Sequence, residues 1–303
     1  EEFLRGKSNL LRLCCGLTLD DPVLDLTHTI DQLNANDLKL LALALKENST
    51  LKSLKWGQIE MSIHGGVDGE DHANTLDLRM KGLRPRDGAL IGIGLMFNTT
   101  LTSLNLRRNE IGAEGGHWIG EGLKVNSTLI TLNLRRTQIG VDGCRGIGEG
   151  LFHNSALTEL DLCRNELRHE GIRWLSKGLT INTSLTKLDL VKNMLGDNGA
   201  RLVGNCLASN AGLLALDLFN NEISEDGARE IAAGVAVNTT LVSLNMGVNQ
   251  VGNEACGVLE RMLKSNTTLE RLILYDNEIG DEGACMIGNG LQLNTTLKTL
   301  NLQ

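Results

Sequence analysis

A 28-residue period organises most of this chain. The segment 101–128, LTSLNLRRNEIGAEGGHWIGEGLKVNST, is repeated in recognisable form without any insertion. Its copies begin at Leu129, Leu157, Leu185, Leu213, Leu241, Leu269 and Leu297. A fixed period of this length is the signature of a repeat array, in which each unit packs against its neighbours and one core runs along the stack. The 303 residues are therefore expected to form one stack of units instead of several globular domains.

Within each unit, the spacing of apolar residues changes from that of a strand to that of a helix. In the unit 101–128, Leu104 and Leu106 alternate with polar residues, whereas Ile119 and Leu123 are four residues apart and share one face of a helix. A helix that returns the chain to the next strand makes neighbouring strands parallel. Strands spaced about 4.8 Å apart and paired with helices about 10 Å wide must form a curved stack, with strands inside and helices outside.

Asparagine and glycine occupy fixed columns of the repeat. One asparagine, Asn109 in this unit, follows the strand, where its amide can satisfy loop backbone groups. Thr137 replaces it in the next unit, and we expect it to weaken the ladder there. A second asparagine follows each helix, where we expect a left-handed turn. The helices are rich in glycine, which predicts a close approach of helix to sheet.

The two ends of the chain depart from the regular unit. Residues 1–22 are dense in leucine and are predicted to form an N-terminal helical cap over the core. Residues 23–72 fit two irregular repeats, and the second is expected to lack its helix because the glycine-rich, acidic stretch 57–73 is typical of a loop. Regular repeats fill 73–303, and the last one is incomplete because it stops inside its strand. We therefore expect a continuation of the chain or an assembly contact at this open C-terminal strand.

Composition and charge exclude several classes of partner and location. The net charge of −8 argues against nucleic-acid binding, which favours a basic surface. No apolar run reaches the roughly 18 residues that a membrane span needs. Seven cysteines without paired spacing fit a reducing compartment, and seven Asn-x-Ser/Thr sequons share one register of the repeat, so a structural turn explains them without glycans. The expected location is cytoplasmic, with cytoskeletal or ciliary association left open.

No catalytic motif is recognisable in the chain. A nucleophile elbow, a phosphate-binding loop and a zinc signature are all missing, so we expect neither an enzyme nor a cofactor or metal site. His64, Asp68, Glu70, Asp71 and His72 lie close together in sequence, but their spacing fits no HExxH, EF-hand or cysteine-based site. We interpret them as part of a solvated loop.

The repeat pattern LxxLxLxxNxIGxxGxxxIGxGLxxNxT resembles that of leucine-rich repeat proteins of the ribonuclease-inhibitor class. The sensor regions of NOD-like receptors, Ran GTPase-activating proteins and tropomodulin-like actin regulators share this kind of repeat. The resemblance covers 73–303 strongly and 23–72 weakly. It implies an α/β leucine-rich repeat solenoid, a curved horseshoe with a parallel β-sheet on the concave face and α-helices on the convex face. It also implies protein binding on the concave face, although such a fold does not define one function.

Strand alternation identifies the side chains that the concave face would display. Between the two strand leucines lies a column of Asp and Asn, which we interpret as a structural ladder of hydrogen bonds along the sheet. The next two columns are basic in the early repeats and carry aromatic residues in the later ones. The candidate partner-binding residues on this face are Arg79, Arg107, Arg108, Arg135, Arg136, Arg164, Lys192, Phe219 and Tyr275.

Like charges on neighbouring strands are destabilising, so the arginines need an explanation. One alternative is internal neutralisation by Asp77, Asp161 and Asp189. The other is a basic patch that receives an acidic segment or a phosphate of a partner protein, because arginine suits bidentate contact with such groups. For Phe219 and Tyr275, the alternatives are an interface anchor and a ring covered by a loop.

These observations leave three functional hypotheses. The first is a non-catalytic scaffold that binds a partner protein on the concave face, within a larger cytosolic, cytoskeletal or ciliary assembly. The second is the ligand-sensing region of a NOD-like immune receptor, which would need a nucleotide-binding domain elsewhere in the full-length protein. The third, a Ran-type GTPase activator, is disfavoured because no catalytic Arg or Asn can be assigned and the chain has no acidic tail.

Overall fold

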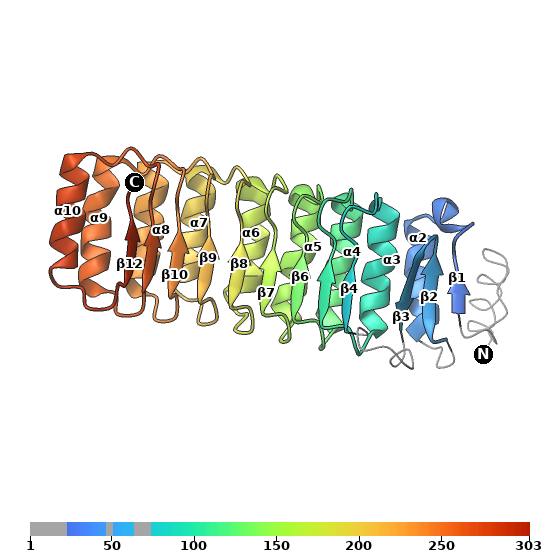
Figure 1. The fold of residues 1–303 in the computed structure, drawn as a ribbon. Helices are drawn as coiled ribbons and strands as arrows, with labels where there is room; N and C mark the ends of the chain where they lie inside the picture. The colour runs from blue at the N-terminus through green and yellow to red at the C-terminus, as the bar shows by residue number, and fades with distance from the viewer. Residues whose placement is uncertain (1–22, 47–50, 64–73) are drawn as a thin grey trace.

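Strands and helices alternate from residue 75 onward in the computed structural model, which describes residues 23–46, 51–63 and 74–303 (Figure 1). The strands are β1 (Val23–Asp25), β2 (Ser53–Trp56), β3 (Ile59–Ser62), β4 (Thr75–Asp77), β5 (Ser103–Asn105), β6 (Thr131–Asn133), β7 (Glu159–Asp161), β8 (Lys187–Asp189), β9 (Ala215–Asp217), β10 (Ser243–Asn245), β11 (Arg271–Ile273) and β12 (Thr299–Asn301). The helices are η1 (Ile30–Gln32), α2 (Ala35–Lys46), α3 (Pro85–Phe97), α4 (Gly112–Val125), α5 (Gly140–His153), α6 (Arg168–Leu179), α7 (Gly196–Leu207), α8 (Glu225–Val237), α9 (Gly252–Ser265) and α10 (Asp281–Leu291). None of these helices is long and apolar enough to cross a membrane. The predicted cap over 1–22 lies outside the described residues, as do the five His, Asp and Glu residues between 64 and 72.

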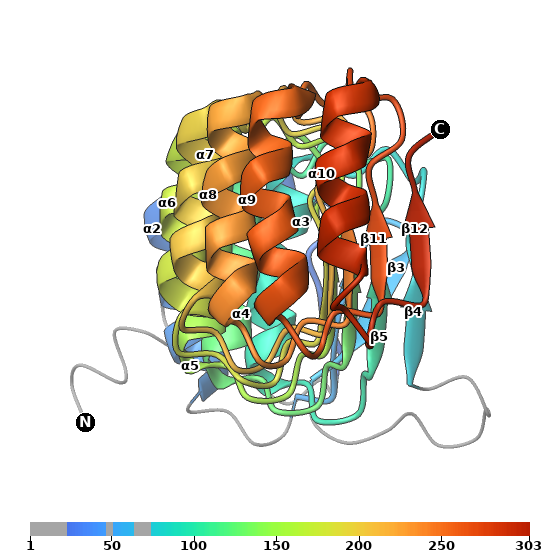
Figure 2. The ribbon, with the colours of Figure 1, turned by 90° about the vertical axis from the view of Figure 1, so that its left-hand side faces the viewer.

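One parallel sheet contains the strands β4 to β12 in chain order. Hydrogen-bonded partners in neighbouring strands are always 28 residues apart, as for Leu104 and Leu132. Viewed along the stack, the strands lie on one side and the helices cover the other (Figure 2). The predicted α/β solenoid, with a parallel sheet on one face and helices on the opposite face, is confirmed.

The core lies between the sheet and the helices. Leu104 and Leu106 point into it and are at most 1% exposed, and Ile119 and Leu123 meet them from α4 with no exposed surface. The intervening residue, Asn105, faces the opposite side of the sheet and is half-buried. The alternation in each strand therefore divides the residues of the repeat between the core and one open face, which we call the strand face.

The asparagine that follows each strand links neighbouring repeats, as predicted. Asn109 Oδ1 accepts from the N–H groups of Lys81 and Leu83 in the preceding repeat, both at 3.0 Å. Its Nδ2 donates to the carbonyl oxygens of Leu78 and Leu106, at 2.9 and 2.7 Å. One buried side chain thus satisfies four backbone groups that have no partner in the sheet.

Thr137 interrupts this ladder. Its Oγ1 donates to the carbonyl oxygen of Leu134 at 2.6 Å, but it provides no amide for the repeat before it. In other repeats, the side-chain oxygen of the asparagine accepts hydrogen bonds from N–H groups of the preceding repeat. The equivalent N–H groups here, those of Asn109 and Ile111, make no hydrogen bond with a described side chain. The expected local weakness is therefore a loss of specific bonds between the repeats of β5 and β6.

Replacing Thr137 with asparagine is expected to stabilise the protein by ~1 kcal/mol, because it restores hydrogen bonds to buried backbone groups. The midpoint of urea unfolding measures the change. Thr137→Ala is the opposing control, since it also removes the bond to Leu134 and should lower the midpoint. If Thr137→Asn instead lowers the midpoint, the missing asparagine does not weaken the contact between these repeats.

The asparagine that follows each helix does not form the left-handed turn that we expected. Asn98 and Asn126 both have φ of −72° with ψ of 128° and 129°, which is extended backbone. Asn126 Nδ2 donates to the carbonyl oxygens of Leu95 and Asn98, and its Oδ1 accepts from the N–H of Leu129 at 2.8 Å. The sequon asparagines are thus a second ladder between repeats. A glycan on a buried amide of this ladder would replace one of the two Nδ2 hydrogens and so remove one of these bonds.

Glycine lets neighbouring helices touch, whereas we expected it to serve the contact between helix and sheet. A Cβ atom on Gly120 of α4 would lie 2.1 Å from the carbonyl oxygen of Gly146 in α5. A Cβ atom on Gly92 of α3 would lie 2.3 Å from the carbonyl oxygen of Trp118. The backbones of α3, α4 and α5 are thus in van der Waals contact, and this packing compensates for the poor helix propensity of glycine.

A short hairpin occupies part of the stretch that we expected to be a loop. Strand β3 pairs antiparallel with β2, so Leu54 lies opposite Met61. Met61 and Ile63 are buried, whereas Glu60 is exposed, which is the alternation of a half-buried strand. The prediction that the whole stretch 57–73 is a loop is therefore wrong for Ile59–Ser62, because the sequence IEMSI has strand periodicity that the surrounding glycines obscured.

Candidate functional site

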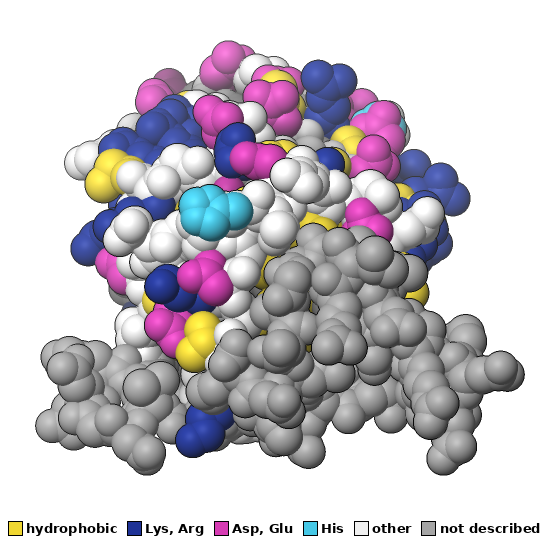
Figure 3. Space-filling model, turned by 90° about the vertical axis from the view of Figure 1, so that its right-hand side faces the viewer, with side chains coloured by type: hydrophobic (Ala, Val, Ile, Leu, Met, Phe, Trp, Pro, Cys, Tyr) yellow, Lys and Arg dark blue, Asp and Glu magenta, His cyan; other side chains and the backbone are white. Residues whose placement is uncertain are grey.

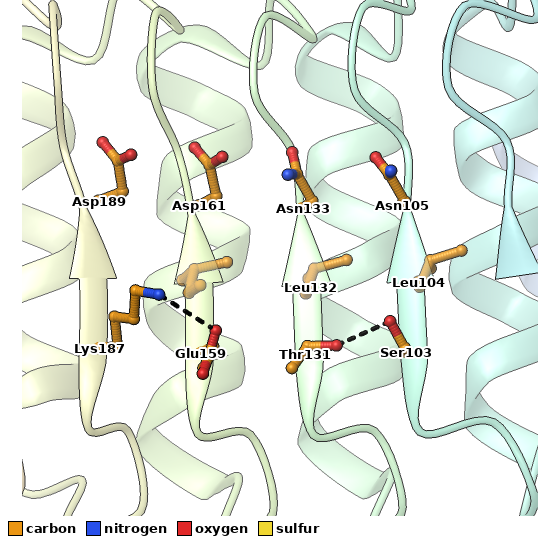
Figure 4. A pocket seen from close by; sticks show the side chains of 11 residues that line it. Ser103, Leu104, Asn105, Thr131, Leu132, Asn133, Glu159, Asp161, Lys187 and Asp189 are labelled. Atoms are coloured by element: carbon orange, nitrogen blue, oxygen red, sulfur yellow. Dashed lines mark hydrogen bonds and ion pairs between the residues drawn. The ribbon is translucent and has the colours of Figure 1, made fainter. Parts of the chain in front are cut away.

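Two neighbouring hollows lie on the strand face. The first has a volume of about 370 Å³ and extends over β5 to β8 (Figure 4). Its polar lining residues are Ser103, Asn105, Thr131, Asn133, Glu159, Asp161, Lys187 and Asp189. The second has a volume of about 350 Å³, extends over β8 to β12 and includes Tyr275 in its lining. Asn105, Asn133, Asp161 and Asp189 form a row at the carboxyl ends of four adjacent strands (Figure 4).

This row of Asp and Asn caps the backbone immediately beyond each strand. Asp189 Oδ1 accepts from the N–H of Val191 at 2.9 Å. The same bond to the residue two positions later recurs in other repeats. A lateral bond joins Asn245 Nδ2 to Asp217 Oδ2 at 3.1 Å. The row is structural, as we interpreted it, but most of its bonds run along the chain and not across the sheet.

Two carboxyl groups in the row ionise with difficulty. Burial raises the pKa of Asp189 to about 6, and the charges of Asp161 and Asp217 add to the effect. Burial also raises the pKa of Asp161, although the N–H of Cys163 and the charge of Arg135 oppose the shift. The centre of the strand face therefore holds acids that favour their neutral form more than ordinary aspartates do.

Replacing Asp189 with asparagine is expected to stabilise the protein at neutral pH. As the pH rises from about 4, the carboxyl ionises first in the unfolded chain, so the folded state loses stability until the pH exceeds the folded pKa of about 6. Asparagine removes this loss and can keep the bond from the N–H of Val191, because Asn133 makes the same bond. The free energy of unfolding should rise by ~1–2 kcal/mol at neutral pH, allowing for solvent screening.

Urea unfolding at neutral pH and below about pH 3 measures this difference. The variant and the parent should be equally stable below about pH 3, where Asp189 is mostly protonated in both the folded and the unfolded chain. A variant that is less stable than the parent at neutral pH would contradict the assignment of a costly ionised carboxylate.

Five arginines gather just beyond β5, β6 and β7. The arginine cluster consists of Arg107, Arg108, Arg135, Arg136 and Arg164. None of the five makes an ion pair within the described part of the chain, so direct neutralisation by the Asp row is not found there. Burial and then the charges of Arg164, Arg108 and Arg135 lower the pKa of Arg136.

Three side chains of the arginine cluster have an unsatisfied donor. The Nε atoms of Arg107, Arg135 and Arg164 are buried and have no hydrogen-bond partner among the described residues. Most buried polar groups in folded proteins are paired, and each exception needs an explanation. The three arginines therefore each keep one donor that no described acceptor reaches.

Three residues of the arginine cluster have a left-handed backbone. Arg108, Arg136 and Arg164 have φ of 57°, 55° and 56°, in the left-handed region that favours glycine. The equivalent residue is also left-handed in the other regular repeats, at Met80, Lys192, Asn220, Val248 and Asp276. The turn alone would therefore favour glycine throughout this column. The left-handed turn is thus a property of the repeat, and it does not by itself explain why three successive repeats carry arginine there.

Two other basic residues that we selected behave differently from the cluster. Arg79 is neutralised, because its Nε lies 3.0 Å from Asp77 Oδ2. Lys192 continues the column of Arg164 by one repeat, and its Nζ lies 6.0 Å from the centroid of the Phe219 ring. Arg79 therefore fits internal neutralisation, whereas Lys192 connects the arginine cluster to the aromatic residues.

Phe219 and Tyr275 form a pair, although they are two repeats apart. Their ring centroids are separated by 5.8 Å and their planes are inclined by 39°. The residue between them is Gly247, where a Cβ atom would lie 2.8 Å from Tyr275 Cε1. The missing side chain thus gives the rings room to meet. Both rings stay half-buried, so part of each is open to a ligand.

The first residue of each strand also faces the first hollow, and the sequence prediction omitted this row. Thr131 Oγ1 donates to Ser103 Oγ at 2.8 Å, and Lys187 Nζ lies 3.6 Å from Glu159 Oε2 (Figure 4). Counting back two residues from Asn105 along the strand would have identified it. These residues form the amino-terminal side of the hollow, opposite the Asp and Asn row.

The end of the stack that carries β1 has a mixed surface. Acidic and basic side chains alternate over its described part (Figure 3). One of the ion pairs near this end joins Arg84 Nη2 to Asp31 Oδ1 at 3.0 Å. Charges of both signs neutralise each other here, whereas the arginine cluster carries one sign.

Asp161, Cys163 and Asp189 are the residues that could hold a metal ion within the described ranges, since their ligand atoms lie within 4.8 Å of one another. Burial raises the pKa of the Cys163 thiol to about 11. A cation would have to displace the thiol proton while the charge of Arg135 acts on all three groups. This chemistry disfavours a metal ion at this place.

Six segments of the chain match the sequence model of the Leucine Rich repeat family, namely 97–117, 125–148, 182–204, 209–232, 237–259 and 265–288. With the 28-residue strand–helix unit, they identify the chain as a leucine-rich repeat protein. Its helical repeats are compatible with the ribonuclease-inhibitor class.

Solved structures with a similar fold include two from proteins with low sequence identity. The C-terminal domain of tropomodulin from Caenorhabditis elegans is 16% identical, with a TM-score of 0.42, and the match covers 50% of this chain and 91% of that one. Leiomodin-1 actin-binding site 2 is 19% identical, with a TM-score of 0.40, and the match covers 50% of this chain and 89% of that one. Comparison with curated protein sequences gives no match.

Proposed function

We propose that this leucine-rich repeat protein is a non-catalytic scaffold that binds a partner protein on its strand face. An acidic segment of the partner lies on the arginine cluster in this proposal. The observation that carries it is the set of five arginines without an ion pair in the described ranges, three of which have a buried and unsatisfied Nε.

Electrostatics supports a specific contact over general attraction to polyanions. The chain has a net charge of −8, so the arginine cluster is a local exception on an acidic protein. A nucleic acid would be repelled by most of the surface, whereas a short acidic segment can contact the cluster alone. Guanidinium groups suit this contact because they donate two parallel hydrogen bonds to one carboxylate.

Buried thiols and buried sequon asparagines support a cytoplasmic location in this proposal. Cys144 and Cys256 have no exposed surface, and burial raises their thiol pKa values to about 12 and about 11. Such thiols are inert small apolar groups that suit a reducing compartment. The amides of Asn126 and Asn238 are occupied in hydrogen bonds and are closed to glycosylation.

Photo-crosslinking from opposite faces tests the proposal. A photoreactive amino acid replaces Lys187, which is exposed on the strand face, or Arg201, which is exposed on α7 of the helical face. In cells, the Lys187 position should crosslink to a partner protein that the Arg201 position does not reach. Crosslinks of equal strength from both positions, or from Arg201 alone, would contradict binding on the strand face.

A further inference from the structure

We infer that the partner segment is an extended peptide with two unlike ends: a group of anionic side chains that contacts the arginine cluster, and an apolar side chain about six residues away that contacts Phe219 and Tyr275. This inference rests on the proposed function and adds the chemistry and the spacing of the ligand.

The spacing follows from the strand positions. The arginine cluster is centred on the repeat of β6, and the aromatic pair is centred on the repeat of β10. The two centres are four strands apart in a sheet whose strands are spaced at about 4.8 Å, which gives a separation of roughly 19 Å. An extended peptide advances about 3.3 Å per residue, so roughly six residues span this separation.

The surface between the two ends suits a peptide that crosses the strands near their carboxyl ends. Cys163 is buried and Val191 is half-buried, so the positions between Arg135 and Phe219 present no charge and little bulk. Lys192 extends the positive charge along one side of this path. The row of Asp and Asn borders its other side, and its negative charges keep an acidic segment beside the arginines and out of the first hollow.

The aromatic end of the path favours an apolar side chain. Phe219 and Tyr275 are tilted against each other over Gly247 and keep part of each ring open. Asp276, next to Tyr275, is exposed and would repel an anionic group at this end. The path therefore has a polarity, because positive charge marks one end and apolar surface with a negative neighbour marks the other.

Labelled synthetic peptides test the spacing directly. Each peptide carries four glutamates and one phenylalanine, separated by two to ten residues of glycine and serine, and fluorescence anisotropy with the full chain measures its affinity. Affinity should be greatest near a spacer of six and about tenfold lower at a spacer of two, where both ends cannot bind together. A second series with phosphoserine in place of glutamate distinguishes the two sources of anionic oxygens.

Two variants assign the ends of the peptide. Phe219→Val combined with Tyr275→Val should remove the spacer preference but keep binding of the glutamates, and valine suits this column because Val191 already occupies it. Tyr275→Phe keeps the ring and should keep the preference. Thermal unfolding of each variant checks that the fold is retained.

The outcomes separate this inference from the proposed function. If binding depends on the arginine cluster but is indifferent to the spacer or to both aromatic residues, the two-ended ligand is wrong and the acidic contact remains. A further variant replaces Arg108, Arg136 and Arg164 with glutamate. If this variant binds the peptides as tightly as the parent protein does, both the inference and the acidic contact are wrong. Absence of binding by every peptide, including the phosphoserine series, also overturns the inference.

Discussion

Replacing Gly120 with alanine is expected to lower the free energy of unfolding by ~3 kcal/mol or more, which is the upper range for overpacking a tight interface. The added Cβ atom would lie 2.1 Å from the carbonyl oxygen and 2.2 Å from the carbonyl carbon of Gly146. Both are backbone atoms, so no side chain can rotate away, and α4 must separate from α5. The gain in helix propensity, about 1 kcal/mol, is too small to offset this.

Gly288 provides a matched control in α10. A Cβ atom there would have nothing within 4 Å, so Gly288→Ala should stabilise the protein by about 1 kcal/mol through helix propensity alone. Urea unfolding followed by circular dichroism measures both variants. If Gly120→Ala and Gly288→Ala shift the midpoint in the same direction, the backbones of α4 and α5 are not in contact and our account of the glycine-rich helices is wrong.

The repeat could be predicted because it depends on local periodicity. Strand alternation at Leu104 and Leu106 and helical spacing at Ile119 and Leu123 each determine which face meets the core. The register followed from the constant period of 28 residues, which places equivalent leucines opposite each other. Residues Ile59 to Ser62 escaped the prediction because they lie outside the 28-residue pattern and close to glycines, which are typical of loops.

The contacts between repeats could not be predicted from one unit. Asparagine after a helix is common in left-handed turns, but here its amide bonds to carbonyl groups up to 31 residues earlier, which local preference does not reveal. Glycine in a helix indicates a close approach without naming the partner. For Gly120, that partner is Gly146 in the next helix and not the sheet.

The sequence predicted which face of the sheet carries the candidate residues, but not which of their side chains contact one another. Alternation placed Arg107 and Arg135 on the same face as Asp161, yet whether opposite charges meet depends on turn geometry and side-chain conformations. Arg79 does pair with Asp77, whereas the cluster has no such contact among the described residues. The approach of Phe219 to Tyr275 depends on the absence of a side chain at Gly247, which becomes apparent only when three repeats are compared in space.

Charge reversal in the arginine cluster is expected to reduce partner binding by at least about 100-fold. The variant combines Arg108→Glu, Arg136→Glu and Arg164→Glu. It loses three cationic donors and repels an acidic ligand, and each close charged contact of this kind contributes several kcal/mol to binding. The fold should tolerate the change, because three repelling arginines become three repelling glutamates that can attract Arg107 and Arg135.

The affinity of this variant for the crosslinked partner is the most direct test of the account. The control is Arg173→Glu, Arg201→Glu and Arg261→Glu, which makes the same change in net charge at exposed arginines of the helical face. Calorimetric titration of both variants, with thermal unfolding as a check on folding, should show binding lost from the cluster variant and retained by the control. Equal binding by the two variants, or equal loss in both, would contradict a partner site at the arginine cluster.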